Sequence, residues 1–115
     1  MDKRLEKALE FSKYMTTLNN QRRLLHEKYL ENTVHYINGG KFSVTKELMN
    51  FVNLLVQHKQ ETAILLDDNN TPIEIEELET FLTELMDIYF NNTNDYYNSY
   101  DDIKTKRSVE RLLDV

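Results

Sequence analysis

Apolar side chains recur at alternating steps of four and three residues in two long stretches of the chain. Within residues 2–37 the series is Phe11, Met15, Leu18, Arg22, Leu25, Tyr29, Asn32 and Tyr36. From Glu76 onward it is Leu78, Leu82, Leu85, Tyr89, Asn92, Tyr96, Ser99 and Ile103. This spacing is typical of a coiled-coil seam, here with polar residues at several layers. The pattern therefore predicts two long helices that pack through their seams.

The end of the first helix has two interpretations. Asn38-Gly39-Gly40 stops the apolar pattern, and glycine is the usual residue just past a helix end. We favour a helix that runs to this cap, because the seam continues to Tyr36. The alternative is a β-hairpin, in which residues 34–37 pair with residues 41–44 across Asn38-Gly39.

The central segment combines one short helix with short strands. Thr45 is the expected N-cap of a helix over residues 46–58, which is apolar around much of its circumference and should be well buried. Residues 62–66 and 71–75 are predicted to form a hairpin around Asp67-Asp68-Asn69-Asn70, with Pro72 on an edge strand. Phe42 and Val44 alternate with polar neighbours and are a candidate third strand.

These elements define the expected fold class. It is mainly α with a minor α+β component: a long antiparallel helical hairpin or coiled coil, with a short central helix and a small β-hairpin. Only two glycines and one proline occur in 115 residues, which favours long helices. We expect a single helical domain over residues 1–115, with residues 103–115 as a semi-independent C-terminal tail.

Charge is distributed unevenly along the chain. The 42 residues from Glu61 to Asp102 contain twelve Asp or Glu and no Lys or Arg, whereas residues 1–41 are net basic. Opposite signs favour pairing of the first helix with the last. The net charge of −6 disfavours nonspecific binding to nucleic acid.

The composition excludes several protein classes. Without cysteine there are no disulfides, no thiolate nucleophile and no Cys-ligated zinc. No apolar run approaches the roughly 18 residues of a membrane span, and no signal-peptide core follows the charged N-terminus. We therefore expect a cytoplasmic protein that does not associate with membranes.

No catalytic, metal-binding or cofactor-binding residues are predicted. A calcium-binding EF-hand loop starting at Asp67 would need Gly and Glu where Pro72 and Leu78 stand. His26, His35 and His58 share no metal-ligand spacing. The glutamates at positions 74–79 are explained by the start of a helix, where the helix dipole favours acids.

Two features suggest contact with a partner. Tyrosines are dense between residues 89 and 100, and they serve either the seam or a protein interface. Those proposed for partner binding are Tyr89, Tyr96, Tyr97 and Tyr100. A basic and then apolar C-terminus is either a helix end suited to its dipole or a docking peptide. Its proposed contact residues are Lys104, Lys106, Arg107, Leu112 and Leu113.

Several runs resemble small uncharacterised proteins of T4-like tailed phages, of the cyanophage type. They are Ala8-Leu9-Glu10-Phe11, Phe42-Ser43-Val44-Thr45-Lys46-Glu47-Leu48, Leu66-Asp67-Asp68-Asn69-Asn70-Thr71-Pro72-Ile73-Glu74-Ile75 and Lys106-Arg107-Ser108-Val109-Glu110. The resemblance implies a viral protein made in the cytoplasm of a bacterial host. It carries no established activity and assigns no functional residue.

The sequence thus predicts a noncatalytic protein–protein interaction or assembly protein. Its partner would be another protein or a second copy of the chain in a homodimer. Two alternatives stay open. One is an accessory factor that touches nucleic acid through basic residues of the first helix and residues 104–107. The other is an acidic mimic of DNA that inhibits a host DNA-binding protein.

Overall fold

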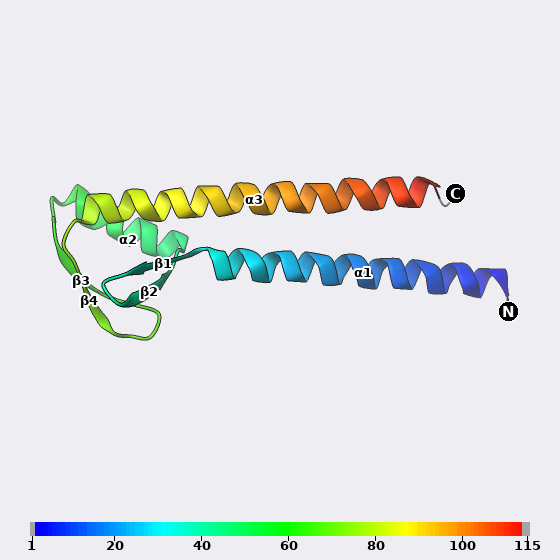
Figure 1. Ribbon diagram of the computed structural model, residues 1–115, viewed down its shortest axis with the longest axis horizontal. Helices are drawn as coiled ribbons and strands as arrows, with labels where there is room; N and C mark the ends of the chain where they lie inside the picture. The colour runs from blue at the N-terminus through cyan, green and yellow to red at the C-terminus, as the bar shows by residue number, and fades with distance from the viewer. Residues whose placement is uncertain (1, 114–115) are drawn as a thin grey trace. The chain divides into compact units, whose positions relative to one another are not determined.

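The computed structural model describes the backbone of residues 2–113 and the side chains of residues 2–105. The chain is mainly helical, as the sequence predicts (Figure 1). Its elements are α1 (Lys3–Asn32), β1 (Val34–Ile37), β2 (Gly40–Ser43), α2 (Lys46–Gln57), β3 (Ala63–Leu66), β4 (Pro72–Ile75) and α3 (Leu78–Leu113). They form two compact units. The helical unit contains α1 up to Lys28 and α3 from Asp95, and the globular unit spans Tyr29–Asn94.

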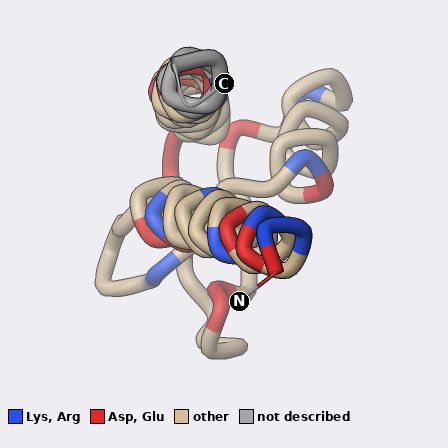
Figure 2. Tube along the Cα trace, turned by 90° about the vertical axis from the view of Figure 1, so that its right-hand side faces the viewer, with Lys and Arg blue, Asp and Glu red and all other residues tan. Residues whose placement is uncertain are grey.

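The helical unit is an antiparallel pair. The Arg22 guanidinium lies 5.2 Å from the centre of the Tyr100 ring, and the His26 and Tyr96 rings lie 6.0 Å apart. As α1 advances from residue 22 to 26, its contacts on α3 move back from residue 100 to 96. The predicted helical hairpin is therefore confirmed. Both signs of charge occur on α1 (Figure 2), but residues 11–26 of that helix contain three Lys or Arg residues and no Asp or Glu.

The seam of α3 follows the predicted positions throughout the described side chains. Leu78 and Leu85 are buried, and the later members of the series are half-buried out to Ile103. On α1, Leu18 is buried and Met15, Arg22, Leu25 and Tyr29 are half-buried. Phe11, which the pattern places in the seam, is half exposed.

Our preferred end for the first helix is wrong, and the alternative hairpin is correct. α1 ends at Asn32, and β1 pairs antiparallel with β2 from Val34↔Ser43 to Ile37↔Gly40. Asn38 and Gly39 both have positive φ, at 50° and 80°, as a two-residue type I′ turn requires. The run from Thr33 to Ile37 is rich in β-branched and aromatic residues, and it prefers a strand over another helical turn.

α2 begins as predicted and is less buried than predicted. Thr45 has an extended backbone, and its hydroxyl accepts a hydrogen bond from Leu48 N at 3.1 Å, as an N-cap does. Val52 is fully buried in the core. Phe51 and Leu54 are each 49% exposed, because the small globular unit covers only one flank of this apolar helix.

The core of the globular unit joins both hairpins, α2 and the first turns of α3. Phe42 of β2 packs edge-to-face on Phe81 of α3, with ring centres 5.4 Å apart. Burying each such side chain contributes about 1.5–3 kcal/mol. The buried members are Phe42, Val44, Val52, Leu65, Ile73, Ile75, Leu78, Phe81 and Leu85.

Two aspartates join the hairpins where we expected a third strand. The strands form two separate two-stranded sheets, β1–β2 and β3–β4. Asp67 Oδ2 accepts a hydrogen bond from Lys41 N at 3.1 Å, and Asp68 N donates to Lys41 O at 2.9 Å. Asp68 also accepts from the backbone N–H and the hydroxyl of Ser43. The turn from Asp67 to Asn70 therefore closes the outer edge of β2, which a solvated turn would not do.

Asp67 is a buried carboxylate that is held by backbone N–H groups. Its side chain is 7% exposed and accepts from the N–H groups of Asn69 and Thr71, each at 2.9 Å, in addition to Lys41. The N–H groups of Thr71 and Lys41 are the main reasons that the pKa of Asp67 lies below its usual value, and burial opposes them in part.

Gly40 marks a close approach between the hairpins. A Cβ atom at this position would lie 2.6 Å from Cγ1 of Ile73, which is itself buried. Gly40→Ala should therefore lower the free energy of unfolding by about 1–3 kcal/mol through overpacking. Urea denaturation measures this loss. Lys41→Ala is the control, because it changes an exposed side chain on the same strand and should be near neutral. Equal stabilities for the two variants would contradict the packing.

The Asp67 site predicts an acid dependence of stability. Because the folded pKa is lowered, the ionised carboxylate stabilises the fold fully above its unfolded pKa of about 3.9. This contribution is lost as the pH falls through that value toward the lower folded pKa. Asp67→Asn should lower the urea midpoint of unfolding at neutral pH. Below about pH 4, the midpoint of this variant should fall less steeply with decreasing pH than that of the wild type. Asp87→Asn, an exposed change on α3, should do neither.

Candidate functional site

The tyrosine-rich stretch of α3 is largely used inside the fold. Tyr89 is half-buried against the globular core, with its ring 5.6 Å from that of Phe90. Tyr96 and Tyr100 are half-buried in the helical unit, and their ring centres lie 6.3 Å apart. Three of the four predicted partner-binding tyrosines therefore have contacts within the chain.

Tyr97 differs from its neighbours. It is 68% exposed, whereas Tyr100 lies under the guanidinium of Arg22 at a distance typical of a cation–π contact. Of the tyrosines proposed for partner binding, Tyr97 is the one that presents most of its ring to solvent. Of the four tyrosines proposed for partner binding, Tyr97 alone is thus largely exposed, so together they form no extended aromatic platform.

The predicted basic patch is described only in part. Lys104 is exposed on α3, and it already has an interaction within the chain. The backbone of α3 continues without interruption to Leu113. The side chains of Lys106, Arg107, Leu112 and Leu113 lie outside the described residues. Their proposed role in partner binding stays a prediction.

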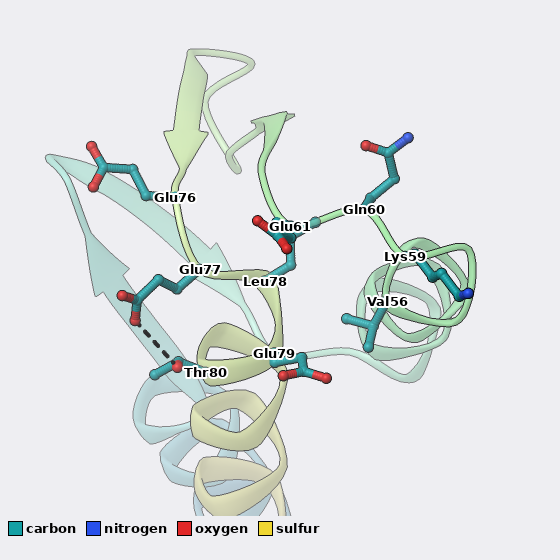
Figure 3. Close-up of a pocket in the computed structure, with 9 residues that line it drawn as sticks. All are labelled: Val56, Lys59, Gln60, Glu61, Glu76, Glu77, Leu78, Glu79 and Thr80. Atoms are coloured by element: carbon teal, nitrogen blue, oxygen red, sulfur yellow. Dashed lines mark hydrogen bonds between the residues drawn. The ribbon is translucent and has the colours of Figure 1, made fainter.

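A cleft of about 520 Å³ lies between the end of α2 and the start of α3 (Figure 3). Its walls carry four glutamates and one lysine. The Glu76 and Glu77 side chains extend away from α2, and Glu77 accepts a hydrogen bond from the Thr80 hydroxyl at 3.3 Å. The lining residues are Val56, Lys59, Gln60, Glu61, Glu76, Glu77, Leu78, Glu79 and Thr80.

The carboxylates make this cleft negatively charged, but they do not point toward one common position. Glu76 and Glu77 are turned to one side, and Lys59, in the turn just after α2, lies on the other (Figure 3). Among residues 2–105, no three His, Asp or Glu side chains are grouped so that they could hold a metal ion. The cleft is therefore suited to attract cationic side chains from a partner over a broad area.

His35 links β1 to α3. Its Nε2 atom lies 2.9 Å from Oε2 of Glu84 but is not aligned for a hydrogen bond, and its ring leans on Phe81 at 5.7 Å. When His35 is protonated, Glu84 is its counter-ion. The contact ties the first hairpin to α3.

Sequence reasoning missed two pairs of apolar side chains that are exposed on the globular unit. On α2 these are Phe51 and Leu54, one helical turn apart. On β3 they are Ile64 and Leu66, which are 63% and 62% exposed and flank the buried Leu65. The alternation of a strand could have revealed the pair on β3, since Leu65 and its two neighbours cannot all face one core.

None of the helices in residues 2–113 combines the length and the apolar character that crossing a bilayer requires. Exposed large apolar side chains are scattered along the long helices and also occur as two pairs on short elements of the globular unit, Phe51 with Leu54 and Ile64 with Leu66. Pairs of this kind are suited to contacts with other proteins.

Tyr97 and Tyr100 allow a matched test of the helical seam. Tyr100→Ala removes the ring beneath Arg22 and should lower the free energy of unfolding by roughly 0.5–2 kcal/mol. Tyr97→Ala makes the same chemical change at an exposed site and should be near neutral. Thermal and urea unfolding, followed by circular dichroism, compare the two. A larger loss for Tyr97→Ala would contradict the assignment of Tyr100 to the seam.

Comparison with known proteins finds no matching family model, no matching curated protein and no matching solved structure.

Proposed function

We propose that this protein is a noncatalytic interaction or assembly protein that works by binding another protein chain. The observation that carries the proposal is the exposed flank of α2. Phe51 and Leu54 are each 49% exposed and lie three residues apart, so they share one face of the helix. The opposite flank of α2 packs Val52 into the core, so the helix is held firmly while it presents these side chains.

A fixed helix with apolar side chains on its outer face is a common element of protein interfaces. Large apolar and aromatic residues supply most of the binding energy in such interfaces, and a rigid support reduces the entropy lost on association. Leu55, on the border of this face, is half-buried against the core and would continue the apolar surface inward. The resemblance to T4-like phage proteins stays a prediction, and it directs the search for a partner to bacterial proteins.

A second candidate is an acidic mimic that captures a DNA-binding protein. The observation in its favour is the cleft between α2 and α3, whose walls place Glu61, Glu76, Glu77 and Glu79 near a single lysine. Such a surface attracts basic proteins electrostatically, and the attraction falls as salt rises. The α2 flank would instead bind through apolar contacts, which salt does not weaken.

The test uses the full chain as bait in nuclease-treated bacterial lysate. Phe51→Lys should abolish capture of a specific partner, because it places a charge in the apolar contact. Asn53→Lys is the matched control, since it adds the same charge at an exposed position on another side of α2. Capture that survives Phe51→Lys would contradict the α2 surface. Capture that is instead lost in Glu76→Gln/Glu79→Gln and at high salt would support the acidic mimic.

A further inference from the structure

The outer edge of β3 carries main-chain groups without a partner. Asp67 N donates to Thr71 O, which fixes the hydrogen-bonded pairs of this hairpin at 67↔71, 65↔73 and 63↔75. The intervening residues, Ile64 and Leu66, therefore direct their N–H and C=O groups away from β4. Within residues 2–113, no hydrogen bond to these four groups is present.

The outer edges of β2 and β4 are occupied, whereas the outer edges of β1 and β3 accept or donate no hydrogen bond within residues 2–113. Asp67 and Asp68 cover the outer edge of β2. On the outer edge of β4, the Asn38 side chain donates to Glu74 O at 2.8 Å, and Pro72 has no N–H to satisfy. β3 has no such cover, and its sequence, Ala63 to Leu66, contains none of the Lys or Pro residues that usually protect an edge strand.

The side chains of β3 match this open edge. Ile64 and Leu66 lie on the face of the hairpin opposite Leu65 and Ile73, which are buried. An uncharged edge with two exposed aliphatic side chains is suited to addition of another strand. The hydrogen bonds would come from the main chain, and the exposed side chains would add apolar contact.

We infer that β3 pairs antiparallel with β3 of a second copy of this chain, around a twofold axis at Leu65; this inference rests on the proposed assembly function. In that register Ile64 lies opposite Leu66 of the second copy, and the reverse pairing follows by symmetry. These are the residues whose N–H and C=O groups point outward. All four groups of each strand therefore find partners, so the edge is complementary to itself.

The same register is favourable for the side chains. Ile64 and Leu66 from both copies form one block of four aliphatic residues on the outer face of a four-stranded sheet. Glu74, which pairs with Ile64, lies at opposite corners of that block in the two copies. Three strand spacings separate the two carboxylates, about 14 Å, which exceeds the screening length of about 8 Å at physiological salt. Their repulsion is therefore weak.

Light scattering over a range of concentrations tests the dimer. The wild-type chain should pass from monomer to dimer as its concentration rises. Ile64→Lys and Leu66→Lys should each remain monomeric, because charge on an edge strand opposes pairing. Phe51→Lys is the control: it places the same charge at another exposed apolar site of the globular unit and should still dimerise. A wild-type chain that stays monomeric, or a dimer that survives both β3 variants, would overturn the inference.

Cysteine crosslinking tests the register directly, since the native chain contains no cysteine. Ile64→Cys and Leu66→Cys would be prepared as separate variants and mixed under mild oxidation. Residues 64 and 66 of opposite copies should have Cα atoms about 5.5 Å apart, within disulfide range. The mixture should therefore crosslink at least several-fold faster than either variant alone. Equal rates would exclude this register.

These experiments separate the failure of the dimer from the failure of the proposed function. If Ile64→Lys no longer self-associates but still captures a partner, the β3 edge and the exposed flank of α2 act independently. A monomeric wild type that still captures a partner through Phe51 would reject the β3 dimer alone. A dimer without any Phe51-dependent partner would support the β3 inference and limit the function to self-assembly.

Discussion

The outer edge of β2 is closed by two aspartates of the neighbouring turn, and the globular unit depends on this contact. Asp67 and Asp68 accept hydrogen bonds from the N–H groups of Lys41 and Ser43, and Asp68 N donates to Lys41 O. They thereby provide the hydrogen bonds that a third strand would supply. The contact holds one hairpin against the other, so that Gly40 lies against Ile73. It also holds β2 where Phe42 can pack on Phe81.

This arrangement changes the interpretation of why the segment between Glu61 and Asp102 is acidic. Its charge asymmetry suggests ion pairs with the basic N-terminal helix. Its acids instead contact other groups. Asp67 accepts hydrogen bonds from backbone N–H groups, and Asp68 accepts one from Ser43. Glu77 accepts a hydrogen bond from Thr80, and Glu84 lies beside His35. A buried carboxylate that accepts several N–H hydrogen bonds needs no cation beside it. The absence of Lys and Arg from this segment is therefore compatible with a buried Asp67.

Periodicity predicts the helices well because a seam is a local property of the sequence. The positions on α3 from Leu78 to Ile103 were all identified, and so were Thr45 as an N-cap and the hairpin around Asp67. The same periodicity misled at Tyr36, which is 70% exposed on β1 although it continues the heptad of α1. There the strand preference of residues 33–37 and the type I′ turn at Asn38-Gly39 prevail over the apolar spacing.

The candidate surfaces were harder to predict, because exposure depends on which elements cover one another. The predicted seam already contains Tyr96, and the contact of Tyr96 with His26 agrees with it. The seam series includes Ser99 and not Tyr100, so only the contact with Arg22 shows that Tyr100 also packs against α1. Likewise, the apolar circumference of α2 predicts burial. Its exposed flank reflects how little of the globular unit is available to cover it.

Asn92 shows how a polar seam residue can determine where a helix ends. Its amide donates to the carbonyl of Asn32, the last residue of α1, at 3.3 Å and to Ile88 O at 2.8 Å. The final carbonyls of a helix have no partner within the helix, so a side chain from the facing helix that donates to one of them stabilises the terminus. A leucine at position 92 could fill the seam but could not make this bond. The polar layer therefore favours the end of α1 at Asn32 and the start of β1 directly after it. By placing β1 there, Asn92 also helps to position the hairpin whose edge Asp67 and Asp68 close.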